Sequence, residues 1–122
     1  MRIHESAENY LEAILILKDS KPAVRSIDVA NYLGFSKPSI SLAMKQFREN
    51  GYITVDKSGA IELTQKGMEI AKNMYERHIL IADMLTKLGV SKEVALSDSC
   101  KIEHAISEET FLKIKDYYET MK

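Results

Sequence analysis

The chain has 122 residues, with 45% hydrophobic and 29% charged side chains, which is typical of a globular protein that buries a core without cross-links. Its single cysteine, Cys100, excludes an internal disulfide and fits a reducing compartment. No apolar run approaches the ~20 residues that cross a bilayer, and the N-terminus lacks a signal-peptide cleavage pattern. These features predict a cytoplasmic protein that does not enter a membrane.

The net charge of −1 is distributed unevenly along the chain. Residues 21–66 hold seven Lys or Arg side chains against four Asp or Glu, a net charge of +3. The flanking residues 1–20 and 67–122 each carry −2. A basic middle segment between acidic flanks indicates that the middle faces an anion.

Two helices are predicted at the start of the chain. Apolar residues recur at three- and four-residue steps over residues 5–18, which predicts an amphipathic helix. A short second helix is expected over residues 27–33, with Ser26 as its N-cap and Gly34 just after its end.

A third helix and a hairpin follow. Ser36 predicts the N-cap of a helix that runs to about Glu49, and Pro38 falls in its first turn, where a missing N–H costs little. Residues 52–55 and 60–63 are two short alternating runs joined by a glycine-containing turn, which predicts a β-hairpin.

The second half of the chain is predicted to be helical throughout. Thr64 is the expected N-cap of a long helix over residues 65–88. Two shorter helices are expected over residues 91–96 and 97–106, and a final helix begins at Ser107. Some apolar residues of this half would form either an internal core or a dimer interface, and their pattern alone allows both.

Three helices followed by a hairpin is the order of a winged helix-turn-helix. The third helix would be the recognition helix, which enters the major groove with its N-terminal end against the bases. Hydroxyls can bond to base edges or phosphates, proline and leucine can touch thymine methyl groups, and lysines can contact phosphates. The predicted DNA contacts are Ser36, Lys37, Pro38, Ser39, Ser41, Leu42, Lys45 and Arg48, with Lys57 at the hairpin tip.

A candidate metal site lies near the C-terminus. Cys100, Glu103 and His104 have the spacing i, i+3, i+4, which puts a thiolate, a carboxylate and an imidazole on one face of a helix. That set suits Fe²⁺, Co²⁺, Ni²⁺ or Zn²⁺ better than Ca²⁺ or Mg²⁺. The alternative is that the cysteine fills a core and the other two are solvated. Further donors could come from His78, Asn9 and Glu12.

Enzymatic chemistry is not supported, because the chain has no glycine-rich phosphate loop, nucleophile elbow or zincin motif. The sequence therefore predicts a DNA-binding regulator rather than an enzyme. Two alternatives remain open: a winged-helix regulator that needs no metal, and an interaction or metal-buffering module that does not bind DNA.

The chain resembles the family of metal-dependent repressors typified by the diphtheria-toxin repressor and the manganese-transport regulator. The likeness covers nearly the whole chain, and its most specific segment surrounds Cys100. The segments that carry it are Glu8-Asn9-Tyr10-Leu11-Glu12-Ala13-Ile14, Ser36-Lys37-Pro38-Ser39-Ile40-Ser41, Leu63-Thr64-Gln65-Lys66-Gly67, Arg77-His78 and Cys100-Lys101-Ile102-Glu103-His104-Ala105-Ile106-Ser107.

The resemblance implies a mainly α-helical protein, with a winged helix-turn-helix domain over residues 1–66 and a helical metal-binding and dimerisation domain over residues 67–122. It implies a homodimeric transcriptional repressor of metal-ion homeostasis genes. Such a repressor binds a palindromic operator in double-stranded DNA when loaded with Fe²⁺ or Mn²⁺, and Zn²⁺ is a third candidate.

The resemblance also implies a ligand set. Asn9 takes the place of an acidic or methionine ligand. Cys100 matches the iron-type branch of the family, whereas the manganese branch has a glutamate at that position. In the two-metal arrangement of the manganese branch, Glu103 bridges the ions. One ion would take His78 and Cys100, and the other Glu12 and His104.

Overall fold

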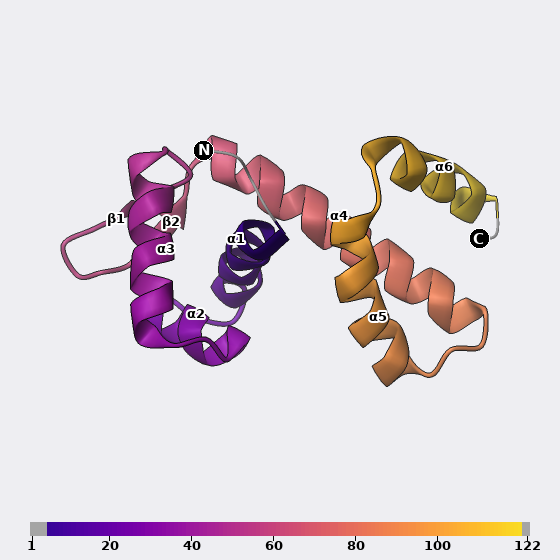
Figure 1. Ribbon diagram of the computed structural model, residues 1–122, viewed down its shortest axis with the longest axis horizontal. Coiled ribbons are helices and arrows are strands. Elements are labelled where there is room, and N and C mark those ends of the chain that lie inside the picture. The colour runs from indigo at the N-terminus through magenta and orange to yellow at the C-terminus, as the bar shows by residue number, and fades with distance from the viewer. Residues whose placement is uncertain (1–4, 121–122) are drawn as a thin grey trace. The chain divides into compact units, whose positions relative to one another are not determined.

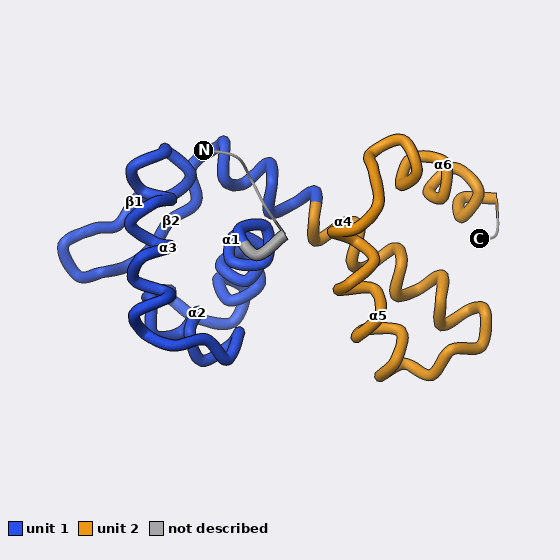
Figure 2. The backbone as a smooth tube through the Cα atoms, in the orientation of Figure 1, with its two compact units in different colours: residues 1–73 blue, residues 74–122 orange. Residues whose placement is uncertain are grey.

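Residues 5–120, the part of the chain that the computed structural model describes, contain six helices and a two-stranded antiparallel sheet (Figure 1). The chain divides into two compact units, residues 1–73 and 74–122 (Figure 2). The predicted class, a winged helix-turn-helix followed by a helical domain, is confirmed. The predicted domain boundary after residue 66 stays a prediction. The elements are α1 (Glu5–Lys18), α2 (Ser26–Leu33), α3 (Lys37–Glu49), β1 (Ile53–Val55), β2 (Ile61–Leu63), α4 (Gln65–Lys87), α5 (Lys92–Ala105) and α6 (Glu108–Glu119).

The described residues include no helix with the length and apolar character that a membrane span requires.

The core of the first unit forms where the apolar stripe of α1 meets α2, α3 and the sheet. Leu11 and Ile14 on α1 are fully buried, as are Ile40 and Phe47 on α3. α1 packs against α2 and β2, and α3 packs against α2 and β1. The three-residue and four-residue spacing of the apolar residues therefore places one face of each helix inside, as predicted.

The turn between α2 and α3 forms as the sequence indicates. Gly34 adopts a left-handed conformation with φ of 73°, and its N–H donates to the Ala30 carbonyl at 2.8 Å. Ser36 is the N-cap of α3, and its Oγ accepts from the Ser39 backbone N–H at 3.3 Å. A short, glycine-closed turn of this kind fixes the position of α3 on α2.

The N-cap predicted for α2 is wrong. Arg25, not Ser26, is the N-cap, and Ser26 is the first residue of the helix. The Asp28 carboxylate, three residues on, accepts from the Arg25 backbone N–H at 2.9 Å. The acidic side chain in the first turn therefore provides a hydrogen-bond acceptor for a backbone N–H at the start of the helix.

This contact predicts a pH effect on stability. The hydrogen bond from the Arg25 backbone N–H holds the pKa of Asp28 below its ordinary value. The ionised Asp28 carboxylate therefore stabilises the fold above about pH 4, the usual Asp pKa. This stabilisation is lost as the pH falls through the lower pKa that Asp28 has in the folded state. We expect Asp28→Asn to destabilise the protein at pH 7 by less than about 1 kcal/mol, because the carboxyl is solvent-accessible. Urea unfolding from pH 7 to about pH 2 should show the difference shrinking, and Asp19→Asn, the same change at an exposed position after α1, is the comparison.

The wing is the hairpin of β1 and β2, paired in the register Ile53 with Leu63 and Val55 with Ile61. Asp56 holds its tip, since its Oδ1 accepts from the backbone N–H groups of Ser58 (2.8 Å) and Ala60 (3.0 Å). The Ser58 hydroxyl also donates to this carboxylate, and these bonds lower the pKa of Asp56. The exposed Lys57 is thus carried on a closed turn.

The start of α4 packs against the strand region at unusually close range. Thr64 caps the helix: its Oγ1 accepts from the Gly67 N–H at 3.2 Å and donates to the Gly51 carbonyl at 2.6 Å. A Cβ on Gly67 would lie 2.1 Å from the Tyr52 carbonyl oxygen. Only glycine therefore permits this approach of helix to backbone.

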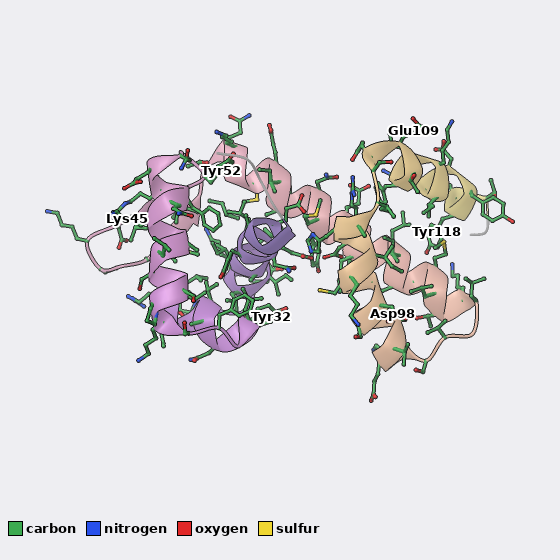
Figure 3. All side chains as sticks on the ribbon, viewed as in Figure 1. Tyr32, Lys45, Tyr52, Asp98, Glu109 and Tyr118 are labelled. Carbon is green, nitrogen blue, oxygen red and sulfur yellow. The ribbon has the colours of Figure 1, made fainter. Side chains whose placement is uncertain are left out.

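The second unit contains the rest of α4 together with α5 and α6. Ile81, Phe111 and Tyr118 are buried in its core, and the Tyr118 hydroxyl donates to Asp83 of α4. Figure 3 shows Tyr118 on α6. Leu112 and Tyr117 of α6 are exposed, as are other apolar residues of this unit, namely Tyr75, Ile79, Leu88, Val94 and Leu96.

The two short helices predicted over residues 91–106 are one continuous helix, α5. A second helix was expected to start at Ser97 or Asp98, but residues 91–96 contain no glycine or proline that would end the first. The Ser99 hydroxyl donates to the Leu96 carbonyl at 3.1 Å, so it is satisfied inside the helix. The first four helices start and end within two residues of their predicted bounds, and the last begins one residue after its predicted start.

Candidate metal centre and DNA-facing surface

Helix α5 brings three of the predicted metal ligands together. Donor atoms of Cys100, Glu103 and His104 all lie within 4.8 Å of one another. Cys100 is exposed, whereas the side chains of Glu103 and His104 are fully buried. The predicted i, i+3, i+4 face therefore forms, with a thiol at its accessible end and a carboxyl at its buried end.

The Glu103 carboxylate links two histidines. Its Oε2 lies 3.1 Å from Nδ1 of His78 on α4, and its Oε1 lies 3.2 Å from Nε2 of His104. Ions with ligand bonds of about 2.0–2.2 Å hold neighbouring ligands about 3 Å apart, so these spacings suit donors of a common site. Two imidazoles, a carboxylate and a thiolate fit a divalent transition metal.

Arg77, next to His78 on α4, forms hydrogen bonds to the C-terminal end of α5. Its buried guanidinium donates from Nη1 to the carbonyls of Glu103 (3.0 Å) and Ile106 (3.1 Å) and pairs with Glu108 through Nη2. The Cζ atom of this guanidinium also lies 5.0 Å from the centre of the Phe111 ring, which is a cation–π contact. This side chain fixes the turn of α5 that carries the predicted ligands, because it donates to carbonyls that have no partner within the helix.

Arg77 and Ser99 also contact residues of this candidate centre, and neither was predicted from the sequence to do so. Ser99 is 0% exposed, and its Oγ lies 2.9 Å from Nδ1 of His78. Its spacing of i−4 from Glu103 puts it on the ligand face, which was a signal that could have been used.

The two remaining predicted ligands, Asn9 and Glu12, lie on α1 in the first unit. Their participation in the centre stays a prediction.

The recognition helix presents the predicted DNA contacts to solvent. Because a helix turns about 100° per residue, Leu42 lies opposite the buried Ile40 and Met44, and it is 58% exposed. Every residue predicted to contact DNA is exposed, namely Ser36, Lys37, Pro38, Ser39, Ser41, Leu42, Lys45, Arg48 and Lys57.

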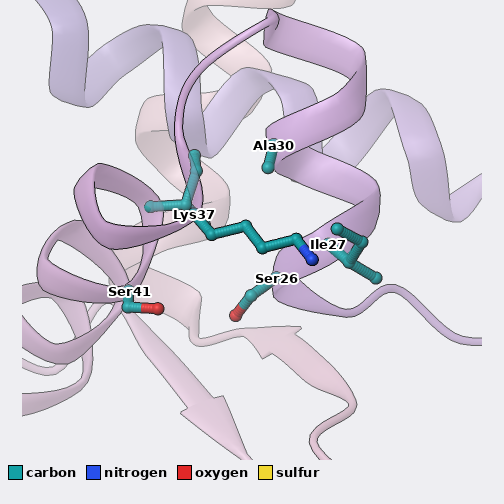
Figure 4. A pocket seen from close by; sticks show the side chains of 6 residues that line it. Ser26, Ile27, Ala30, Lys37 and Ser41 are labelled. Carbon is teal, nitrogen blue, oxygen red and sulfur yellow. The ribbon is translucent and has the colours of Figure 1, made fainter.

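Two shallow hollows mark this surface. The first, of about 250 Å³, lies between α2 and α3, and the Lys37 side chain crosses it toward Ser26 and Ile27 (Figure 4). The second, of about 180 Å³, is lined by Lys45 and Arg48 of α3 and by Val55 of β1. Ser26 and Ser41 line both. Hydroxyl and cationic side chains around concave surface between helix and wing suit a phosphate backbone.

A winged helix-turn-helix with an exposed basic helix, followed in the chain by a helical unit with transition-metal donors, defines a metal-dependent DNA-binding regulator. Residues 2–61 match the family described as the iron-dependent repressor N-terminal DNA-binding domain. Residues 64–122 match the iron-dependent repressor metal-binding and dimerisation domain. The chain therefore belongs to the iron-dependent repressor family, whose members are DNA-binding regulators and not enzymes.

Individual relatives agree with this membership. The chain is 31% identical over 120 residues to an uncharacterized HTH-type transcriptional regulator of Methanocaldococcus jannaschii, covering 97% of this chain and 96% of that protein. It is 34% identical over 106 residues to the transcriptional regulator MntR of Escherichia coli O157:H7, covering 87% and 68%. A solved manganese-dependent transcriptional repressor in complex with manganese is 26% identical, with a TM-score of 0.85 over 93% of this chain. This chain spans 52% of that solved repressor's length.

Proposed function

We propose that this protein is a cytoplasmic homodimeric repressor that binds a palindromic operator of metal-ion homeostasis genes when a divalent transition metal is bound. The observation that carries the proposal is the Glu103 carboxylate placed between His78 and His104, beside Cys100. A buried carboxylate and two imidazoles, with a thiol at the accessible edge, form a donor set that an ion would hold together.

The donor set favours particular ions. A thiolate such as that of Cys100 is a soft donor, which favours Fe²⁺ or Zn²⁺ over Mn²⁺ among the candidates. Asn9 and Glu12 would add oxygen donors from the first helix. The amide of Asn9 is neutral, so it would contribute less to the binding of a cation than a carboxylate would.

Metal would act on DNA binding through a difference in affinity. An ion shifts the protein toward its DNA-binding state only if it binds that state more tightly than the other. Couplings of this kind are typically about 1–3 kcal/mol, which corresponds to a 5–150-fold change in operator affinity. In the bound state, lysines of α3 and the wing would contact phosphates, and Leu42 and Pro38 would touch base edges.

The experiment that tests the function is selection from a pool of random duplexes, carried out anaerobically with Fe²⁺, Mn²⁺, Zn²⁺ or no metal. We expect palindromic sequences to be enriched only with metal, and with Fe²⁺ more than with Mn²⁺. Enrichment without metal would instead favour a metal-independent winged-helix regulator. No enrichment under any condition would favour an interaction module.

Lys45→Ala should weaken binding to every duplex, because we expect Lys45 to contact a phosphate, which every duplex carries, and not a base. We expect the slope of log affinity against log salt to fall by about one unit. Fluorescence anisotropy over a salt series measures this slope. Lys92→Ala, an exposed lysine at the start of α5, is the matched control and should leave the slope unchanged. Equal slopes for both variants would show that Lys45 does not contact a phosphate of the bound DNA.

A further inference from the structure

Arg25 makes a contact between α2 and the wing that the function described above does not use. Its Nε donates to the Ser58 carbonyl in the turn of the wing at 3.1 Å, across a separation of 33 residues. A hydrogen bond from a charged donor is stronger than one from a neutral donor. Because Arg25 is also the N-cap residue of α2, this contact joins the tip of the wing to the helix-turn-helix formed by α2 and α3.

The wing needs support from outside because its strands are short. Three residue pairs connect β1 with β2, and residues 56–60 form the turn that extends beyond them (Figure 1). A two-stranded hairpin alone is only marginally stable in water. At its base, the Ile61 N–H donates to the carbonyl of the buried Val24 at 2.7 Å. This bond holds the start of β2, but the turn must be positioned by another contact.

Arg25 supplies that contact. Among the described residues, it is the one that donates a hydrogen bond to the turn 56–60 from outside the hairpin. The pKa of Asp56, which closes the turn, is lowered mainly by hydrogen bonds within the turn, first that of the Ser58 hydroxyl, and also by the positive charge of Arg25. Lys57, the predicted DNA contact of the wing, directly precedes Ser58. The position of Lys57 relative to α2 therefore depends on the Arg25 side chain.

We propose that Arg25 is a positioning residue for DNA binding, which holds the turn of the wing against α2 so that Lys57 contacts a phosphate while α3 lies in the major groove. The inference rests on the proposed function, since it presumes that α3 and the wing bind one duplex together. Lys45 and Arg48 of α3 and Val55 of the wing line one hollow, so the recognition helix and the wing border the same concave surface. A wing that pivoted away from this surface would lose its phosphate contact.

Two neutral substitutions separate the Nε–H donor of Arg25 from its charge. In Arg25→Gln, the side-chain NH₂ nitrogen takes the place of Nε in the chain of atoms and can donate to Ser58. In Arg25→Met, a methyl carbon takes that place and cannot donate. Both variants remove the same charge, and both keep the backbone N–H that donates to Asp28. Their thermal midpoints should therefore be similar.

The test is the salt dependence of binding to a mixed-sequence duplex, measured anaerobically by fluorescence anisotropy with Fe²⁺, Mn²⁺ or Zn²⁺. We expect the slope of log affinity against log salt to be about one unit larger for Arg25→Gln than for Arg25→Met, because Arg25→Met loses the phosphate contact of Lys57. In a Lys57→Ala background, the slopes of the two variants should be equal.

Equal slopes of Arg25→Gln and Arg25→Met in the presence of Lys57 overturn the proposal, because the hydrogen bond to the wing would then have no part in binding. A difference that persists in the Lys57→Ala background also overturns it, since Arg25 would act on some other contact. If the unaltered protein binds no duplex with any of the three ions, the proposed function fails as well. That result differs from intact binding with equal slopes, so the two failures are distinguishable.

Discussion

Glu103→Gln should reduce metal affinity by at least about 100-fold, because it removes a buried anion that lies between two histidines. Glutamine keeps the shape of the side chain but replaces one oxygen by an NH₂ group, which cannot bind a cation. The negative charge of the side chain is lost, and only one oxygen remains to contact a histidine. Metal-dependent operator binding should disappear with it.

The measurement is anaerobic chelator competition with Fe²⁺ and Zn²⁺, followed by operator binding at saturating metal. Glu93→Gln is the control, since Glu93 is an exposed acid in the first turn of the same helix. It makes the same chemical change and should retain wild-type metal affinity. Wild-type affinity in Glu103→Gln would show that the buried carboxylate has only a structural role.

Gly67→Ala should destabilise the protein by about 3 kcal/mol, at the upper end of the cost of overpacking. The added methyl group would lie 2.1 Å from the Tyr52 carbonyl oxygen. That oxygen is backbone and accepts from the Thr64 N–H at 3.1 Å, so it cannot move without disturbing the start of α4. The usual stabilising effect of alanine over glycine in a helix, about 1 kcal/mol, is too small to offset the clash.

Chemical denaturation, with the midpoint and the slope compared, measures the effect. Glu69→Ala, an exposed position on the same turn of α4, should stay within about 0.5 kcal/mol of the unaltered protein. A Gly67→Ala variant as stable as Glu69→Ala would mean that the helix can shift away from the strand. The close packing would then not explain the glycine.

The helical pattern and the hairpin could be predicted from the sequence because each depends on local signals. The stripe of α1 follows from apolar spacing, and the ends of α3 follow from Ser36 and from Asn50, which the chain places at its two caps. In α5 the local signal gave a wrong helix start. A serine can be the N-cap of a helix, or it can lie inside a helix with its hydroxyl bonded to a carbonyl one turn back. The sequence alone does not distinguish these two uses of Ser97 and Ser99.

The candidate metal centre could be predicted to the extent that it lies on one helix. The spacing of Cys100, Glu103 and His104 needs only helical geometry. The contacts of Arg77 and Ser99 join α4 to α5 over separations of 26 and 21 residues, and they depend on which faces of the two helices meet. Such pairings are set by tertiary packing, which the periodicity of a single helix does not specify.

Cys100 differs from the other predicted ligands of α5 in its accessibility, and this has a consequence for how such a centre can change over generations. Glu103 and His104 are enclosed, so a substitution at either disturbs buried packing. The side chain at position 100 is exposed, so it can be exchanged for a harder donor while the enclosed residues keep their places. If Cys100 binds the ion, a single codon change at this accessible position would alter the preference among metal ions and leave the enclosed architecture as it is.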